Sequence, residues 1–137
     1  MRFKIGDHAS ISKTITEADI ALFVAVSGDT NPLHTNAEYA KRSRFGERIA
    51  HGSLTASLIS NVIGTKLPGV GAVYLSQTLK FIKPVKIGDT ITATATLTQL
   101  REDRPILTLR TICTNQKGET VLEGEAHVLY DESVSEV

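Results

Sequence analysis

The chain has 137 residues, which is enough for one domain with its own core but too few for two comfortable ones. Its 15 Lys and Arg residues balance 15 Asp and Glu residues, aromatic residues make up 5% of the chain, and Trp is absent. Nucleic-acid-binding domains usually carry a basic excess and aromatic side chains that stack on bases. The composition therefore disfavours that class, and any anionic ligand has to be met by local charge.

The sequence favours a cytoplasmic protein without a membrane segment. The N-terminal residues contain no apolar segment of the kind found in secretory signal peptides. The single Cys113 cannot form an intrachain disulfide, and its alternating apolar surroundings indicate a buried, reduced thiol. Residues 49–65 lack Asp, Glu, Lys and Arg, but a membrane span needs about 20 predominantly apolar residues. A core helix fits this segment better.

The first half of the chain shows mostly helical patterns, after one predicted strand at residues 8–15. Apolar residues at helical spacing predict a first helix, and Thr16 with Asp19 forms a possible capping box at its start. That spacing comes from Ile20, Phe23, Val24 and Ser27. A short helix is expected at residues 37–42. A longer one at 52–66 has apolar or small residues on every face, so it should be wrapped on most sides.

The second half alternates between apolar and polar residues, as half-buried strands do. The predicted strands lie near residues 73–81, 90–98, 107–111 and 122–130. Turn signals separate them at residues 88–89, 103–105 and 116–118. The tetrapeptide KIGD occurs at residues 4–7 and 86–89, and both copies are read as a turn followed by a strand. The expected fold is α+β, with a curled antiparallel sheet around one long central helix.

One short segment combines side chains suited to proton transfer. Asp29-Thr30-Asn31-Pro32-Leu33-His34 follows the first helix, and Pro32 stiffens it. Asp29 and His34 can both exchange protons near neutrality when partly buried, and the Asn31 amide can orient a water molecule. Asp and Asn also favour turns for local reasons, and a His on a surface loop is usually inert. Composition and spacing alone leave both interpretations open.

A second candidate element is His51-Gly52, at the start of the uncharged helix. A glycine there lets a ligand approach the backbone N–H groups of the helix N-terminus, where an oxyanion could bind. The alternative is that Gly52 only caps the helix.

Together these elements resemble the MaoC-like, (R)-specific enoyl-CoA hydratases, which have the hotdog fold. The resemblance rests on Asp29-x-Asn31-Pro32-x-His34 followed by His51-Gly52, and on the segment Phe81-x-x-Pro84-Val85-x-x-Gly88-Asp89. It covers nearly the whole chain and implies one hotdog domain over residues 1–137. The closest likeness is to the short hydratases that feed polyhydroxyalkanoate synthesis.

The resemblance implies hydration of trans-2-enoyl-CoA to (R)-3-hydroxyacyl-CoA, or the reverse dehydration, in a homodimer that needs no cofactor. It implies that Asp29 and His34 are the catalytic pair and that Asn31 positions the water. It further implies that the N–H of Gly52 polarises the thioester carbonyl and that Ser60 supports the site.

Two other functions stay open: a hotdog thioesterase, and a non-catalytic subunit that binds acyl thioesters. Four basic residues before His51 either meet the phosphates of coenzyme A or are ordinary solvated charges; they are Lys41, Arg42, Arg44 and Arg48. The four histidines contain no i, i+4 pair, and Cys113 has no CxxC partner, so no metal site is expected.

Overall fold

The computed structural model describes residues 2–101 and 103–136, so both ends of the predicted domain 1–137 lie outside the described residues. Its centre is a five-stranded antiparallel sheet in the order β1-β3-β4-β5-β2. The strands are β1 (His8–Thr14), β2 (Ala72–Phe81), β3 (Thr90–Leu100), β4 (Ile106–Thr114) and β5 (Thr120–Tyr130). The helices are α1 (Glu17–Ser27), α2 (Pro32–Thr35), α3 (Ala37–Lys41), α4 (Gly52–Thr65) and the 3₁₀ turn η1 (Glu132–Val134).

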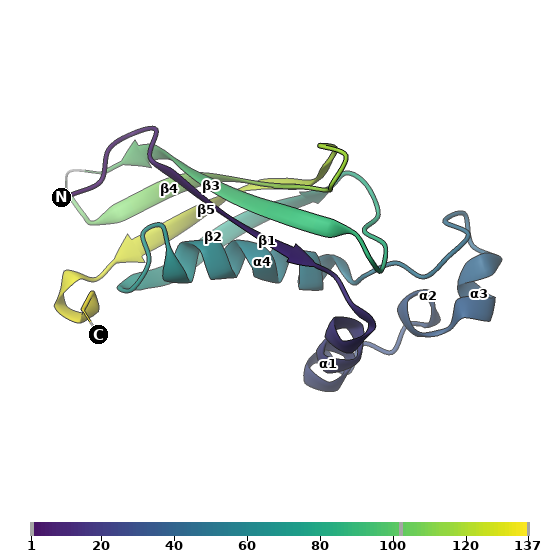
Figure 1. Ribbon diagram of the computed structural model, residues 1–137. Coiled ribbons are helices and arrows are strands. Elements are labelled where there is room, and N and C mark those ends of the chain that lie inside the picture. The colour runs from purple at the N-terminus through teal and green to yellow at the C-terminus, as the bar shows by residue number, and fades with distance from the viewer. Residues whose placement is uncertain (1, 102, 137) are drawn as a thin grey trace.

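Helix α4 lies along one face of the sheet, while α1, α2 and α3 gather beyond one end of it (Figure 1). The predicted fold class is thereby confirmed. Two short elements, α2 and η1, were not expected from the sequence. No helix of the described residues is long and apolar enough to cross a membrane.

The core lies between α4 and the inner face of the central strands. Strand β3 shows the expected alternation, because every second residue from Ile91 to Leu97 is fully buried. On the opposite face of β3, three threonines exchange hydroxyl hydrogen bonds with β1, at Ser10–Thr94, Ser12–Thr92 and Thr14–Thr90. Cys113 is fully buried, as expected, and burial raises the pKa of its thiol to about 12.

The expectation that apolar alternation buries one face of every strand is wrong for β2. Val73, Leu75 and Phe81 are 44%, 52% and 54% exposed. Strand β2 is at the edge of the sheet, and its pairing with β5 shifts register between Tyr74 and Ser76. Alternation reports which face a residue is on, whereas burial also requires an element to cover that face.

Helix α4 is covered on one side only, so the expected wrapping on most sides is also wrong for this chain. Its buried stripe includes Ile59, Val62 and Ile63. Ser57, Ser60, Asn61 and Gly64 are exposed on the other side. The residues on that side are small and uncharged, so the sequence does not mark it as the side that faces outward.

The two KIGD segments form the same turn. In each, the backbone N–H of the Lys donates to the Asp carboxylate at 2.9 Å, and the Asp N–H donates back to the Lys carbonyl at 3.0 Å. Gly6 and Gly88 take positive φ values of 95° and 97°, which only glycine adopts without strain. The predicted role of these segments as turns that precede strands is confirmed.

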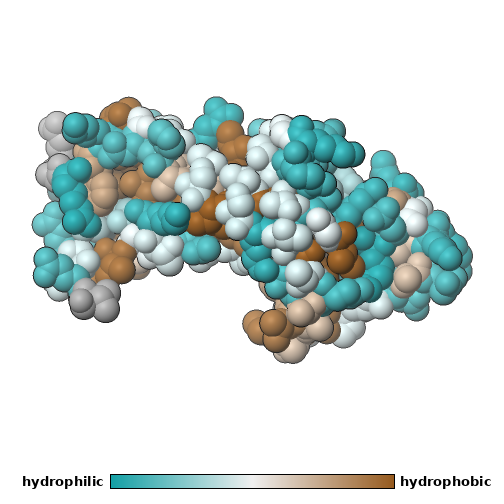
Figure 2. All heavy atoms as spheres, in the orientation of Figure 1, coloured by the Kyte–Doolittle hydropathy of each residue, from teal (hydrophilic) through white to brown (hydrophobic). Residues whose placement is uncertain are grey.

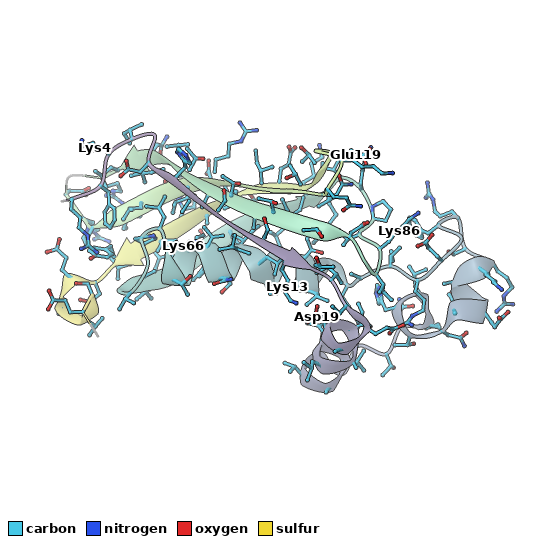
Figure 3. All side chains as sticks on the ribbon, in the orientation of Figure 1. Lys4, Lys13, Asp19, Lys66, Lys86 and Glu119 are labelled. Carbon is cyan, nitrogen blue, oxygen red and sulfur yellow. The ribbon has the colours of Figure 1, made fainter. Side chains whose placement is uncertain are left out.

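The capping box at the start of α1 is also confirmed. The Thr16 hydroxyl accepts from the Asp19 N–H, and the Asp19 carboxylate accepts from the Thr16 N–H. Lys13, at the end of β1, points toward Asp19 and lies 2.8 Å from its carboxylate (Figure 3). The hydrogen bond from Lys13 holds the pKa of Asp19 below its usual value. This ion pair anchors α1 against the edge of the sheet.

Candidate active site

The segment that carries Asp29 and His34 is fixed by its own backbone. Gly28, with φ 75°, ends α1, and its N–H donates to the Val24 carbonyl at 2.8 Å. The Asp29 carboxylate accepts from the Asn31 N–H at 3.1 Å, and the Asn31 side-chain carbonyl accepts from the Leu33 N–H at 3.0 Å. Asn31 is therefore the N-cap of α2, whose first residue is a proline. The loop expected here is a turn leading into one helical turn.

This geometry restricts what Asn31 can do. Its amide oxygen is used to cap α2, which leaves the amide N–H₂ as the group that could reach a water molecule.

His34 is partly buried, and its hydrogen bonds define its free nitrogen. Its Nδ1 lies 2.7 Å from the carbonyl oxygen of Ile49. A carbonyl can only accept, so Nδ1 carries a hydrogen and Nε2 is left to exchange protons. Arg48 donates through Nε to the His34 carbonyl at 2.7 Å, and its guanidinium forms a two-bond pair with Glu17. This pair ties the segment of His34 to the start of α1.

A third residue, His51, joins the pair. It is 2% exposed, its Nε2 lies 3.0 Å from the carbonyl oxygen of Asp29, and its ring stacks on His34 with centroids 4.0 Å apart. Asp29, His34 and His51 each offer a polar atom within 4.8 Å of the others, although Asp29 itself is exposed.

Such a cluster is also the usual starting point for a metal site. The two rings, however, stack 4.0 Å apart and are inclined by only 27°, so a nearby metal ion could not lie in the planes of both rings, as imidazole ligation requires. One nitrogen of each ring already faces a backbone carbonyl. The arrangement suits proton exchange better than metal ligation.

His34 and Gly52 share a cavity of about 640 Å³. Its other walls include Phe45, Thr55 and Phe81. His51, not Gly52, is the N-cap of α4, and its side chain makes no capping hydrogen bond. The first N–H groups of α4 are thus without a side-chain cap beside the cavity, and the helix dipole adds positive potential there.

Gly52 has a steric reason to be glycine. A Cβ atom at this position would lie 2.7 Å from the Phe81 ring. Any side chain here would therefore force that ring to move.

Ser60 lies elsewhere. It lines a smaller hollow between α4 and β2, together with Tyr74 and Gln77, and does not line the cavity of His34 and Gly52. Ser53 lines both hollows. Tyr74 is 38% exposed, and its partial burial raises the pKa of its hydroxyl.

The four basic residues before His51 divide into different roles. Arg48 is engaged by Glu17 and the His34 carbonyl, and Lys41 lies 3.7 Å from Glu38. Arg42 lies over the Tyr39 ring. Arg44 lies over the Phe45 ring and lines the cavity.

From the sequence, His51 belonged to the second candidate element, but only its neighbour Gly52 was assigned a role. The only signal for His51 was its place beside Gly52, since no spacing rule connects residues 29, 34 and 51. The tertiary structure brings it under both Asp29 and His34.

Comparison with known proteins supports this fold. Residues 5–116 match the MaoC like domain model. The chain is 54% identical over 126 residues to the (R)-specific enoyl-CoA hydratase of Rhodospirillum rubrum, covering 92% of this chain and 87% of that protein. It is 45% identical over 126 residues to the 3-hydroxybutyryl-CoA dehydratase of Methylorubrum extorquens, covering 91% and 79%.

A solved structure gives the same result for the fold. The (R)-hydratase from A. caviae involved in PHA biosynthesis superimposes with a TM-score of 0.92 at 43% identity, covering 94% of this chain and 98% of that one. This chain therefore belongs to the MaoC-like domain family and has its hotdog fold.

Proposed function

We propose that this chain hydrates trans-2-enoyl-CoA to (R)-3-hydroxyacyl-CoA, or runs the reverse dehydration, with Asp29 and His34 as its catalytic pair. One observation carries the proposal: polar atoms of Asp29 and His34 lie within 4.8 Å of each other, and His34 shares its cavity with Gly52 at the uncapped N-terminus of α4. The (R)-specific hydratase and the dehydratase described above, both similar over most of the chain, support the same reaction.

In the hydration direction, a bound water gives a proton to one member of the pair while its oxygen forms a bond to the β-carbon. The π electrons of the double bond shift toward the thioester oxygen, and a proton is then delivered to the α-carbon. Asp29 and His34 exchange these two protons, with His34 acting through Nε2 because Nδ1 is held by the Ile49 carbonyl.

The developing negative charge is on the thioester oxygen. The free N–H groups at the start of α4, beginning with Gly52, are the donors suited to stabilise it. Asn31 orients the water through its amide N–H₂. Ser60 has a supporting role from the neighbouring hollow along α4.

The proposal includes a homodimer that acts in the cytoplasm without a cofactor. Strand β2 leaves an unpaired edge, with exposed Val73, Tyr74 and Leu75 available to pack on a second copy. The buried thiol of Cys113 suits a reducing compartment.

The deciding experiment mixes the purified protein with crotonyl-CoA and follows the loss of enoyl-thioester absorbance, with a thiol reagent in a parallel sample. Loss of absorbance without free thiol, and formation of the (R)-3-hydroxy product, is the expected result. Release of thiol would identify a thioesterase instead. Unchanged short, medium and long enoyl-CoAs would identify a binding subunit.

A further inference from the structure

We propose that His51 is a positioning residue that fixes Asp29 and His34 relative to each other. It does so as the tautomer with its hydrogen on Nε2. This inference rests on the proposed function, because it assigns His51 a part in the same proton exchange.

The side chain of His51 is not explained by its place in α4. N-cap positions favour Ser, Thr, Asp and Asn, whose side chains accept from the first N–H groups of the helix. His51 makes no such bond. Its ring is turned to the Asp29 loop, where it is 2% exposed.

The hydrogen bond to Asp29 defines the tautomer. Nε2 lies 3.0 Å from the backbone carbonyl oxygen of Asp29. Because that oxygen has no hydrogen to give, Nε2 must be the donor. Nδ1 is buried and has no hydrogen-bond partner among the described residues.

The same ring also sets the plane of His34. The two rings stack at 4.0 Å, and Phe23 closes the site with its ring centroid 4.8 Å from that of His51. The His51 ring therefore contacts Asp29 at its backbone carbonyl and His34 at its imidazole ring. Asp29 is on the exposed loop after α1, and nothing else described links its carbonyl to His34.

His51 does not reach the substrate. It is 2% exposed, its Nε2 is occupied by a backbone oxygen and its Nδ1 is buried, so neither ring nitrogen is open to a ligand. Its effect is on placement. A displacement of about 1 Å in a catalytic group can lower a rate roughly 100-fold.

Two substitutions separate the contacts. His51→Phe keeps a ring that can stack on His34 but loses the donor to Asp29, whereas His51→Gln keeps a donor and loses the ring. We expect His51→Phe to lower kcat about 10–100-fold with KM for crotonyl-CoA within about twofold, and His51→Gln to retain more activity than His51→Phe. Ile20→Val, which thins the buried core elsewhere, should leave kcat unchanged.

A double-mutant cycle tests whether His51 acts through Asp29. The loss caused by His51→Phe should shrink on an Asp29→Asn background, because the carboxylate that it positions is no longer there. A kcat of His51→Phe within twofold of the wild type would overturn the proposal. The proposal would also be overturned if His51→Phe and His51→Gln lowered kcat equally and each loss were additive with the loss caused by Asp29→Asn.

The tautomer has its own test, which needs neither a variant nor turnover. In ¹⁵N-histidine-labelled wild-type protein, two-dimensional NMR of the imidazole nitrogens should give His51 a protonated Nε2 and a bare Nδ1 at pH 7. A hydrogen on Nδ1 would overturn the proposal even if the protein is a hydratase. Absence of hydration by the wild type would overturn the proposed function and leave this measurement intact.

Discussion

At the residue scale, the site is assembled from backbone groups that fix side chains. The Ile49 carbonyl selects the tautomer of His34, the Asp29 carboxylate accepts from the Asn31 N–H, and Asn31 caps α2. Each of these contacts leaves one group free for chemistry: Nε2 of His34, one carboxylate oxygen of Asp29 and the amide N–H₂ of Asn31. Isosteric substitutions at these residues should therefore leave the protein folded but lower its catalytic rate.

Removing either of the two groups proposed to exchange protons tests that view. Asp29→Asn and His34→Gln should each lower kcat by about 10²–10⁴-fold, the usual contribution of general acid–base catalysis. Thermal unfolding should show that both variants remain folded, because Asp29 is exposed and His34 only partly buried. Near-normal turnover of crotonyl-CoA in either variant would refute its assignment.

Arg44 and Arg48 should respond differently to truncation. Arg44 lines the cavity and has no ion pair among the described residues. Arg44→Ala should raise KM about two- to tenfold, because it removes a contact to the phosphates of coenzyme A. It should also weaken the salt dependence of KM, because salt screens such contacts. Arg48→Ala removes the pair with Glu17 and should lower the melting temperature instead. Steady-state kinetics at several salt concentrations would separate them; an Arg44→Ala variant with the wild-type salt response would mean a solvated charge.

At the element scale, close contacts between neighbouring elements determine which substitutions are tolerated. Strand β5 passes so close to β2 that a Cβ atom at Gly124 would lie 1.8 Å from the backbone oxygen of Thr78. On the exposed side of α4, in contrast, Gly64 has nothing within 4 Å of such an atom.

These two glycines make a matched pair of tests. Gly124→Ala should lower the free energy of unfolding by about 1–3 kcal/mol or more, because β2 must move away from β5. Gly64→Ala should raise it by about 0.5–1 kcal/mol, since alanine loses less backbone entropy in a helix. Urea unfolding of both variants gives the two values, and a neutral Gly124→Ala would contradict the close approach of the strands.

The capping box of α1 should make the stability of the protein depend on pH in acid. The pKa of Asp19 is lower in the folded chain than the ordinary value of 3.8, so its contribution to stability is complete above about pH 4–5 and is lost as the pH falls through the folded-state pKa. Asp19→Asn should therefore destabilise the protein by roughly 1 kcal/mol at pH 7, and by less as the pH falls below 4. Unfolding measured between pH 7 and 3 checks this. Glu38→Gln, at an exposed pair, should show no comparable trend.

At the scale of the whole molecule, a single chain leaves two apolar surfaces exposed to solvent. The edge strand β2 exposes apolar side chains, and α1 projects from the sheet with Leu22 and Val26 exposed by 65% and 85% (Figure 2). Exposed sheet edges template pairing with a second copy unless they are charged or covered.

A charge at the β2 edge should break the proposed dimer. Wild-type protein is expected to elute with twice the monomer mass in size-exclusion chromatography with light scattering, and Leu75→Lys to shift toward the monomer. Ile5→Lys, at an exposed apolar residue before β1, is the matched control and should stay dimeric. A dimeric Leu75→Lys would move the interface away from β2.

The sequence by itself determined the class of fold, the long helix, the strands after residue 70 and the short segment proposed to carry the chemistry. These features depend on local periods and turn chemistry, which the chain expresses over a few residues, as in β3 and in the two KIGD turns. The resemblance of Asp29-x-Asn31-Pro32-x-His34 to a known family added the reaction, and the comparisons agree with it.

Only the tertiary structure decided which of these groups meet. It placed His51 against Asp29 and His34, assigned Arg48 to Glu17 rather than to the cavity, and separated Ser60 from the cavity of Gly52. It also left β2 and one side of α4 uncovered, although their residues look like core in the sequence. Burial and proximity depend on the packing of elements that are distant in the chain, and no local period encodes that packing.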